Sequence, residues 1–234
     1  MQQLILAAAV AALLGIPATG AQAITVAKPG IDATVTASVN PTRLPARGTA
    51  PVTLAVAGTI IRTDAATAPN PPLQEISFLL DRQLMATTVG LPTCGDAAGA
   101  PLAYTRKHCA AALLGSGTVE ETDSSGAQRH ADLLFLNTRR GVRMYIAIAH
   151  PAPGQPRSAT VSFGSGRRFR IRLGAGRAKV SFRFRLGRTW REEGEQHSYL
   201  SGRCMTGTLR TQVSLSFTDG EVSEAEPQRC TKVG

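Results

Sequence analysis

The stretch that decides the fold is residues 167–186, which read RRFRIRLGAGRAKVSFRFRL. Apolar and charged residues alternate on both sides of the glycine-containing segment Gly174–Arg177. A period of two is typical of strands that bury one face, and two such runs joined by a short loop predict a β-hairpin. A four-residue loop sets Ile171 opposite Val180, with the phenylalanines on the same, core-facing side.

The other side of the predicted hairpin carries a row of cations. Its members are Arg168, Arg170, Arg172, Lys179, Arg183 and Arg185. The same register sets Arg172 opposite Lys179. Directly opposed like charges destabilise a strand pair by up to about 1 kcal/mol, so a counter-charge is expected. It comes either from the chain's own carboxylates, at Glu192–Glu195 or in the acidic last strand Glu221–Pro227, or from an acidic partner.

The rest of the chain shows short alternating runs separated by turn signals at intervals of roughly ten residues, a pattern that indicates a β-sandwich. The predicted fold class is all-β, an antiparallel β-sandwich. Leu133–Leu136 is an unbroken apolar run, which predicts a strand buried on both faces. One short helix is expected near 104–114, with Cys109 in its middle, because alanine and leucine favour helix there.

The beginning of the chain has the pattern of a secretory signal peptide. Leu4–Leu14 is apolar and is followed by the small-residue motif Ala21-Gln22-Ala23, so residues 1–23 are predicted to be removed on export. Residues 24–234 are then expected to form a single β-sandwich domain. The alternative is two smaller β domains split near 151–156, a proline-rich connection. No membrane span is expected after cleavage of the signal peptide.

Four cysteines remain in the predicted mature chain, and export makes disulfides permissible. Three connectivities are possible. We favour the pairs Cys94–Cys109 and Cys204–Cys230, which lie close in sequence. Each would close a short loop and stabilise the fold by roughly 3 kcal/mol.

The charge of the chain is strongly basic and unevenly placed. The net charge is +10, and residues 139–210 hold 16 Lys and Arg against three Glu, a balance of +13. Such a surface favours acidic partners, here an acidic cell-wall or extracellular polymer. Nucleic acid is not an expected partner, since the phenylalanines of the hairpin face the core and provide no stacking platform. The oligomeric state is left open.

Motifs of known chemistry are missing from the sequence. Neither G-x-S-x-G nor S-x-x-K occurs, and no spacing of His and Cys predicts a metal site, so no catalytic residue, metal or cofactor is assigned. Paired carboxylates can hydrolyse glycosides, and Glu120/Glu121 and Glu192/Glu193/Glu195 are the candidates. A secreted carbohydrate- or cell-wall-active hydrolase is therefore the alternative function. A structural assembly module that pairs edge strands is the third.

Four motifs resemble those of a group of secreted bacterial all-β proteins with no established activity. They are GLPTC (Gly90–Cys94), CAAALLGSG (Cys109–Gly117), HSYLSGRC (His197–Cys204) and the pair Arg229-Cys230. The resemblance supports the local disulfide pairing, because the cysteine motifs form two separate units. It implies no functional residue. The leading hypothesis is a secreted or cell-surface, non-enzymatic β-sandwich that binds an acidic polymer through its basic face.

Overall fold

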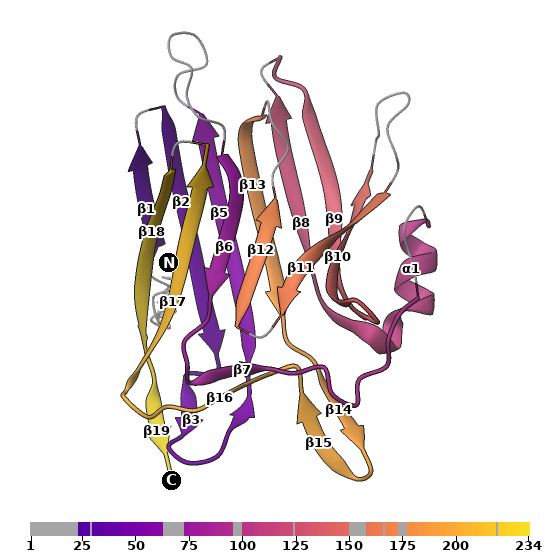
Figure 1. Ribbon diagram of the computed structural model, residues 1–234, viewed down its shortest axis with the longest axis vertical. Helices are drawn as coiled ribbons and strands as arrows, with labels where there is room; N and C mark the ends of the chain where they lie inside the picture. Colours follow the sequence, from indigo (N-terminus) through magenta and orange to yellow (C-terminus); the bar gives the residue numbers. More distant parts are fainter. Residues whose placement is uncertain are drawn as a thin grey trace, which may run out of the picture.

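A single large antiparallel sheet dominates the protein (Figure 1). The computed structural model describes residues 23–28, 30–62, 73–95, 100–123, 125–149, 158–165, 167–172, 177–218 and 220–234. The twelve strands of the sheet are, in spatial order, β1 (Ala23–Lys28), β2 (Ile31–Asn40), β5 (Thr53–Arg62), β13 (Arg177–Leu186), β8 (Leu113–Asp123), β9 (Gln128–Thr138), β10 (Gly141–Ile148), β11 (Ser158–Ser165), β12 (Arg168–Arg172), β6 (Leu73–Leu79), β17 (Thr208–Phe217) and β18 (Gly220–Arg229).

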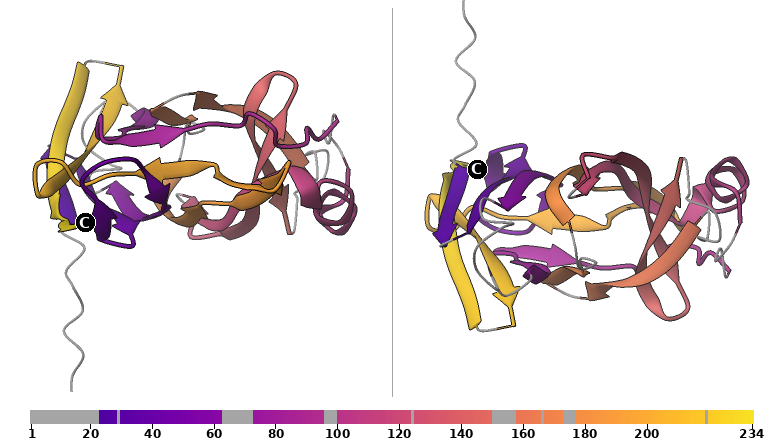
Figure 2. Two further views of the ribbon diagram at one scale, coloured as in Figure 1. Left: turned by 90° about the horizontal axis from the view of Figure 1, so that it is seen from below. Right: turned by 90° about the horizontal axis from the view of Figure 1, so that it is seen from above.

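The sheet folds over into two layers that face each other across one hydrophobic core (Figure 2). Strands β2, β5, β13 and β8 form one layer, and β11, β12, β6 and β17 form the other. The bend lies at the β9–β10 hairpin, and β18 contacts β1 where the two ends of the sheet meet. The predicted antiparallel all-β sandwich is confirmed.

Phenylalanines from both layers meet in the core. The ring centroids of Phe135 and Phe163 lie 4.5 Å apart, and those of Phe163 and Phe184 lie 6.0 Å apart. Phe169, Phe182 and Ile171 are also buried. The inward orientation predicted from the alternation in residues 167–186 is therefore confirmed.

The predicted hairpin between the two halves of that stretch is wrong. β12 pairs with β11 and β6, whereas β13 pairs with β5 and β8. Ile171 lies opposite Ile76, and Val180 lies opposite Ile60 and Glu121. Alternation determines which side of a strand is buried but not which strand lies beside it. The chain changes layers here, so the expected like-charge pairs do not form.

A short helix covers the outer face of the bend. α1 (Leu102–His108) is followed by the 3-10 turn η1 (Ala110–Ala112), and Cys109 lies between them, not in the middle of a helix. Leu134 and Leu136 are buried in this outer cluster, while Leu133 and Phe135 point into the main core. The double-sided burial predicted for Leu133–Leu136 is confirmed.

Three smaller sheets close the lower end of the sandwich in Figure 1. They are β4 (Ala50–Pro51), β16 (Leu200–Gly202) and β7 (Leu84–Ala86); the hairpin of β14 (Thr189–Glu192) and β15 (Glu195–Ser198); and β3 (Arg43–Pro45) with β19 (Thr231–Val233).

Both predicted disulfides are present, Cys94–Cys109 and Cys204–Cys230. The first ties the loop after β7 to the end of α1. The second joins the open ends of the β17–β18 hairpin. Two disulfides indicate that the chain folds in an oxidising compartment.

Two predictions concern residues outside the described parts. The predicted signal peptide lies there except for Ala23, which is the first residue of β1. The connection at 151–156 lies there as well. Strands from before and after this connection alternate in the large sheet. β13, which follows the connection, lies between β5 and β8, which precede it.

Candidate functional site

The six cations predicted to form one basic row lie on two different faces of the sandwich. Arg168, Arg170 and Arg172 are exposed on the outside of β12, and Lys179, Arg183 and Arg185 are exposed on the outside of β13. β12 and β13 belong to opposite layers, so the two sets point away from each other. A single basic face made of all six residues does not exist.

The set on β12 has its own counter-charge. Glu75 lies opposite Arg172 on the neighbouring strand β6. Its two carboxylate oxygens lie 3.7 Å from Nε of Arg170 and 3.5 Å from Nε of Arg172. Glu75 therefore supplies the counter-charge of Arg170 and Arg172, which was expected from Glu192–Glu195 or from the last strand.

The set on β13 has a different environment. Arg183 lies between Ala57 on β5 and Thr118 on β8, and Arg185 lies between Ala55 and Ser116. Within the described ranges, neither guanidinium forms an ion pair with a carboxylate. Asp132, the next acid across the sheet from Thr118, is paired instead with Arg106 at 3.4 Å.

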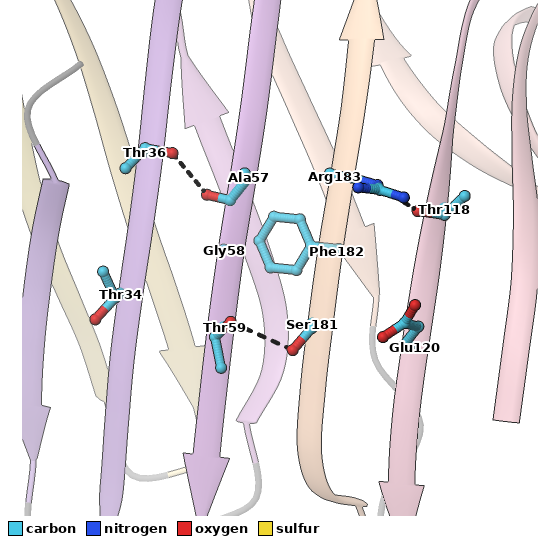
Figure 3. A pocket seen from close by; sticks show the side chains of 10 residues that line it. All are labelled: Thr34, Thr36, Ala57, Gly58, Thr59, Thr118, Glu120, Ser181, Phe182 and Arg183. Atoms are coloured by element: carbon cyan, nitrogen blue, oxygen red, sulfur yellow. Dashed lines mark hydrogen bonds between the residues drawn. The ribbon is translucent and has the colours of Figure 1, made fainter. Parts of the chain in front are cut away.

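These two arginines line a shallow groove on the outside of the first layer. Figure 3 shows the part of it that contains Arg183. The groove consists of two adjoining hollows of about 390 and 380 Å³, which share Thr36, Ala57, Thr118 and Arg183. We call it the β5 groove. It is lined from four strands by Thr34, Thr36, Ser38, Ala55, Val56, Ala57, Gly58, Thr59, Ser116, Gly117, Thr118, Glu120, Ser181, Phe182, Arg183, Phe184 and Arg185.

The groove is hollow because the outward side chains of β5 are small. Ala55, Ala57 and Thr59 form its floor. On one side of this floor lie Thr34, Thr36 and Ser38 of β2, and on the other lie Ser181, Arg183 and Arg185 of β13. Below the floor, the Phe182 ring occupies the space left free by Gly58; a Cβ at that glycine would lie 2.5 Å from Cζ of Phe182. Phe182 thereby fills the core beneath the groove without raising its floor.

Hydrogen bonds orient several of the lining side chains. Nε of Arg183 donates to Oγ1 of Thr118 at 3.2 Å, as Figure 3 shows, which leaves its two terminal nitrogens for another acceptor. The Thr36 hydroxyl donates to the carbonyl of Ala57 at 3.2 Å.

Glu120 is the one carboxylate among the groove-lining residues. Its Oε1 lies 3.8 Å from Nδ1 of His130, and both side chains are well exposed. The groove is therefore cationic at the end near Arg185 and carries a carboxylate at the end near Thr34.

Other acidic side chains of the described residues lie outside the groove. Oδ1 of Asp123 accepts hydrogen bonds from the hydroxyl and amide of Ser125 and from the amide of Ala127, and these bonds hold the pKa of Asp123 below its usual value. Glu192 on β14 and Glu195 on β15 lie opposite each other in the backbone register of their hairpin. The described residues contain no group of three potential metal ligands, and none of their helices is long and apolar enough to cross a membrane.

Sequence reasoning did not find the hydroxyl row of the groove. Thr34, Thr36 and Ser38 alternate with buried residues along β2, and this polar side was visible in the sequence. The strand order β2-β5-β13-β8 brings this polar side near Arg183. The incorrect hairpin prediction excluded that order, because it gave β12 one of the two places beside β13.

Comparison with known proteins gives no further guide, because no family model, curated protein or solved structure matches this chain.

Proposed function

We propose that this protein is a secreted or cell-surface, non-enzymatic β-sandwich that binds an acidic polymer in the β5 groove. The observation that carries the proposal is the pair Arg183 and Arg185, whose guanidinium groups line a hollow and have no carboxylate partner in the described parts of the chain. Residues two apart on an antiparallel strand are about 7 Å apart. They therefore present two positive charges in line, as an extended polyanion requires.

The β12 cations are a weaker candidate for the same role. Glu75 lies against Arg170 and Arg172, so a ligand there would compete with an existing carboxylate. No hollow among those described includes them.

Secretion is supported by the signal-like beginning of the sequence together with the two disulfides. An acidic polymer of the cell wall or the extracellular medium is the class of ligand that an exported protein would meet.

The experiment is retention of the purified mature chain on a carboxylated polymer matrix, eluted with rising salt. Arg183→Ser/Arg185→Ser should elute at clearly lower salt than the wild type. The matched control is Arg168→Ser/Arg170→Ser, which removes the same charge from the opposite face and should elute later than the β13 variant. Equal shifts of the elution salt concentration in the two variants would mean that retention depends on net charge alone, and would refute a site in the groove.

One observation bears on the alternative hydrolase. Glu120 lines the groove, and its Oε1 lies 3.8 Å from Nδ1 of His130, which is not itself a lining residue. The Glu120 side chain is 68% exposed, so it lacks the buried setting of a carboxyl group that acts as a general acid. Release of reducing sugar from wall polysaccharides by the wild type, and its loss in Glu120→Gln, would favour the hydrolase.

A further inference from the structure

The groove offers more than positive charge, and its other groups bear on the chemistry of the ligand. We propose, building on the binding function above, that the acidic polymer is a polysaccharide whose charged sugars alternate with neutral, hydroxyl-rich ones, and not a dense polyanion such as polyphosphate.

The first reason is the polarity of the groove along the strands. Arg185 and Ser116 line one hollow, and Glu120 lines the other, with Arg183 shared between them. A polyanion with a charge at every repeat would place negative charge against the Glu120 carboxylate. Two negative charges that lie close together repel each other, so the end of the groove near Glu120 favours a neutral part of the ligand.

The second reason is the hydrogen-bonding capacity of the walls. Thr34, Ser38 and Ser116 carry hydroxyls with no protein partner among the described residues, and each can donate one hydrogen bond and accept others. Thr36 already donates to Ala57 and so offers a lone pair. Glu120 is an acceptor only. The Glu120 carboxylate and the lone pair of Thr36 need a ligand with O–H or N–H donors, which sugars have and polyphosphate lacks.

The third reason is the presentation of Arg183. Its Nε is used by Thr118, so the free edge of the guanidinium consists of the two terminal nitrogens. Two parallel N–H groups match the two oxygens of a carboxylate or sulfate in a bidentate contact. The shallow groove also leaves such a ligand open on one side, as fits an internal stretch of a long chain.

The test compares two probes of equal net charge, a hyaluronan oligosaccharide and a linear polyphosphate, by calorimetric titration at fixed salt. The wild type should bind the oligosaccharide about tenfold more tightly or better. Glu120→Lys should strengthen polyphosphate binding and weaken oligosaccharide binding. Thr34→Val removes one exposed hydroxyl while keeping a β-favouring shape; it should weaken binding of the oligosaccharide alone.

The outcomes separate the two proposals. If neither probe binds, the binding function itself fails. If polyphosphate binds as tightly as the oligosaccharide and both depend on Arg183 and Arg185, the binding function stands and the polysaccharide assignment is overturned. Strengthening of both probes by Glu120→Lys would also overturn it, because the carboxylate would then have no selective role.

Discussion

The side-chain amide of Gln228 on β18 forms two hydrogen bonds with the backbone of Val39 on β2. The amide of Val39 donates to Oε1 at 2.7 Å, and Nε2 of Gln228 donates to the Val39 carbonyl at 2.8 Å. The described pairing of β1 with β2 ends at Thr36, and Val39 lies further along β2. The glutamine side chain takes the place of a strand there and links the two ends of the twelve-stranded sheet.

Replacing this glutamine should loosen the closure. Gln228→Ala removes two partly buried hydrogen bonds, and each contributes about 0.5–1.5 kcal/mol net, so the free energy of unfolding should fall by about 1–3 kcal/mol. Urea denaturation measures it. Gln212→Ala, on the exposed face of β17, is the control and should lose clearly less. Equal stability of the two variants would show that the link to Val39 does not hold the layers together.

A methyl group at Gly58 should be costly. Its Cβ would lie 2.5 Å from Cζ of the buried Phe182 ring, whereas the same change at Gly95 meets nothing within 4 Å. Overpacking of a core costs typically about 1–3 kcal/mol. Gly58→Ala should lower the unfolding midpoint, and Gly95→Ala should not. Adding Phe182→Leu to Gly58→Ala should recover part of the loss; a purely additive double variant would contradict the proposed clash.

The Cys94–Cys109 disulfide should stabilise one region selectively. It closes a 15-residue separation, worth about 3 kcal/mol in the chain-entropy model. In Cys94→Ser/Cys109→Ser, amide hydrogen exchange should rise in α1 and over Leu134 and Leu136, while β17 and β18 keep their protection. Uniform loss of protection across both regions would mean that the helix and the sandwich unfold as one unit.

Alkaline pH should destabilise the protein through Tyr199. Burial raises the pKa of this phenol above its ordinary value of 10.0, so the unfolded chain loses the proton first as the pH rises. The stabilisation from keeping Tyr199 protonated is fully present below pH 10 and is lost above it. Relative to Tyr199→Phe, the wild type should lose about 1.4 kcal/mol more between about pH 9 and pH 11.

Urea unfolding at the two pH values measures that difference. Tyr104→Phe, which removes the phenol hydroxyl of a tyrosine exposed on α1, is measured beside it as the control for the substitution itself. An identical pH dependence in Tyr199→Phe and the wild type would contradict the burial effect.

What could be predicted from the sequence was the local part of the fold. Alternation correctly placed Phe169 and Phe182 in the core, and the apolar run at Leu133–Leu136 correctly predicted a strand covered on both sides. Neighbouring strands could not be predicted in the same way. The side-chain pattern of β13 is satisfied equally by β12 or by β5, since both present apolar residues at the same period. The residues of β8 opposite Val180 and Phe184 are Glu121 and Gly117, which gave no apolar signal for that neighbour.

Only part of the candidate site could be predicted from the sequence, because the neighbours of each strand could not be predicted. Exposure of Arg183 and Arg185 followed from the pattern. Their separation from Arg168 and Arg170, and the presence of Thr34 and its neighbours beside them, followed only from the long-range strand order.

Binding in the β5 groove is tested most directly by locating the amides that a bound acidic polysaccharide protects from hydrogen exchange. Amide hydrogen exchange of the mature protein would be measured with and without saturating hyaluronan. Exchange should slow in the segments of β5, β13 and β8 that line the groove and should stay unchanged in β12 and β6. Protection confined to β12 and β6, or none on either face, would contradict it.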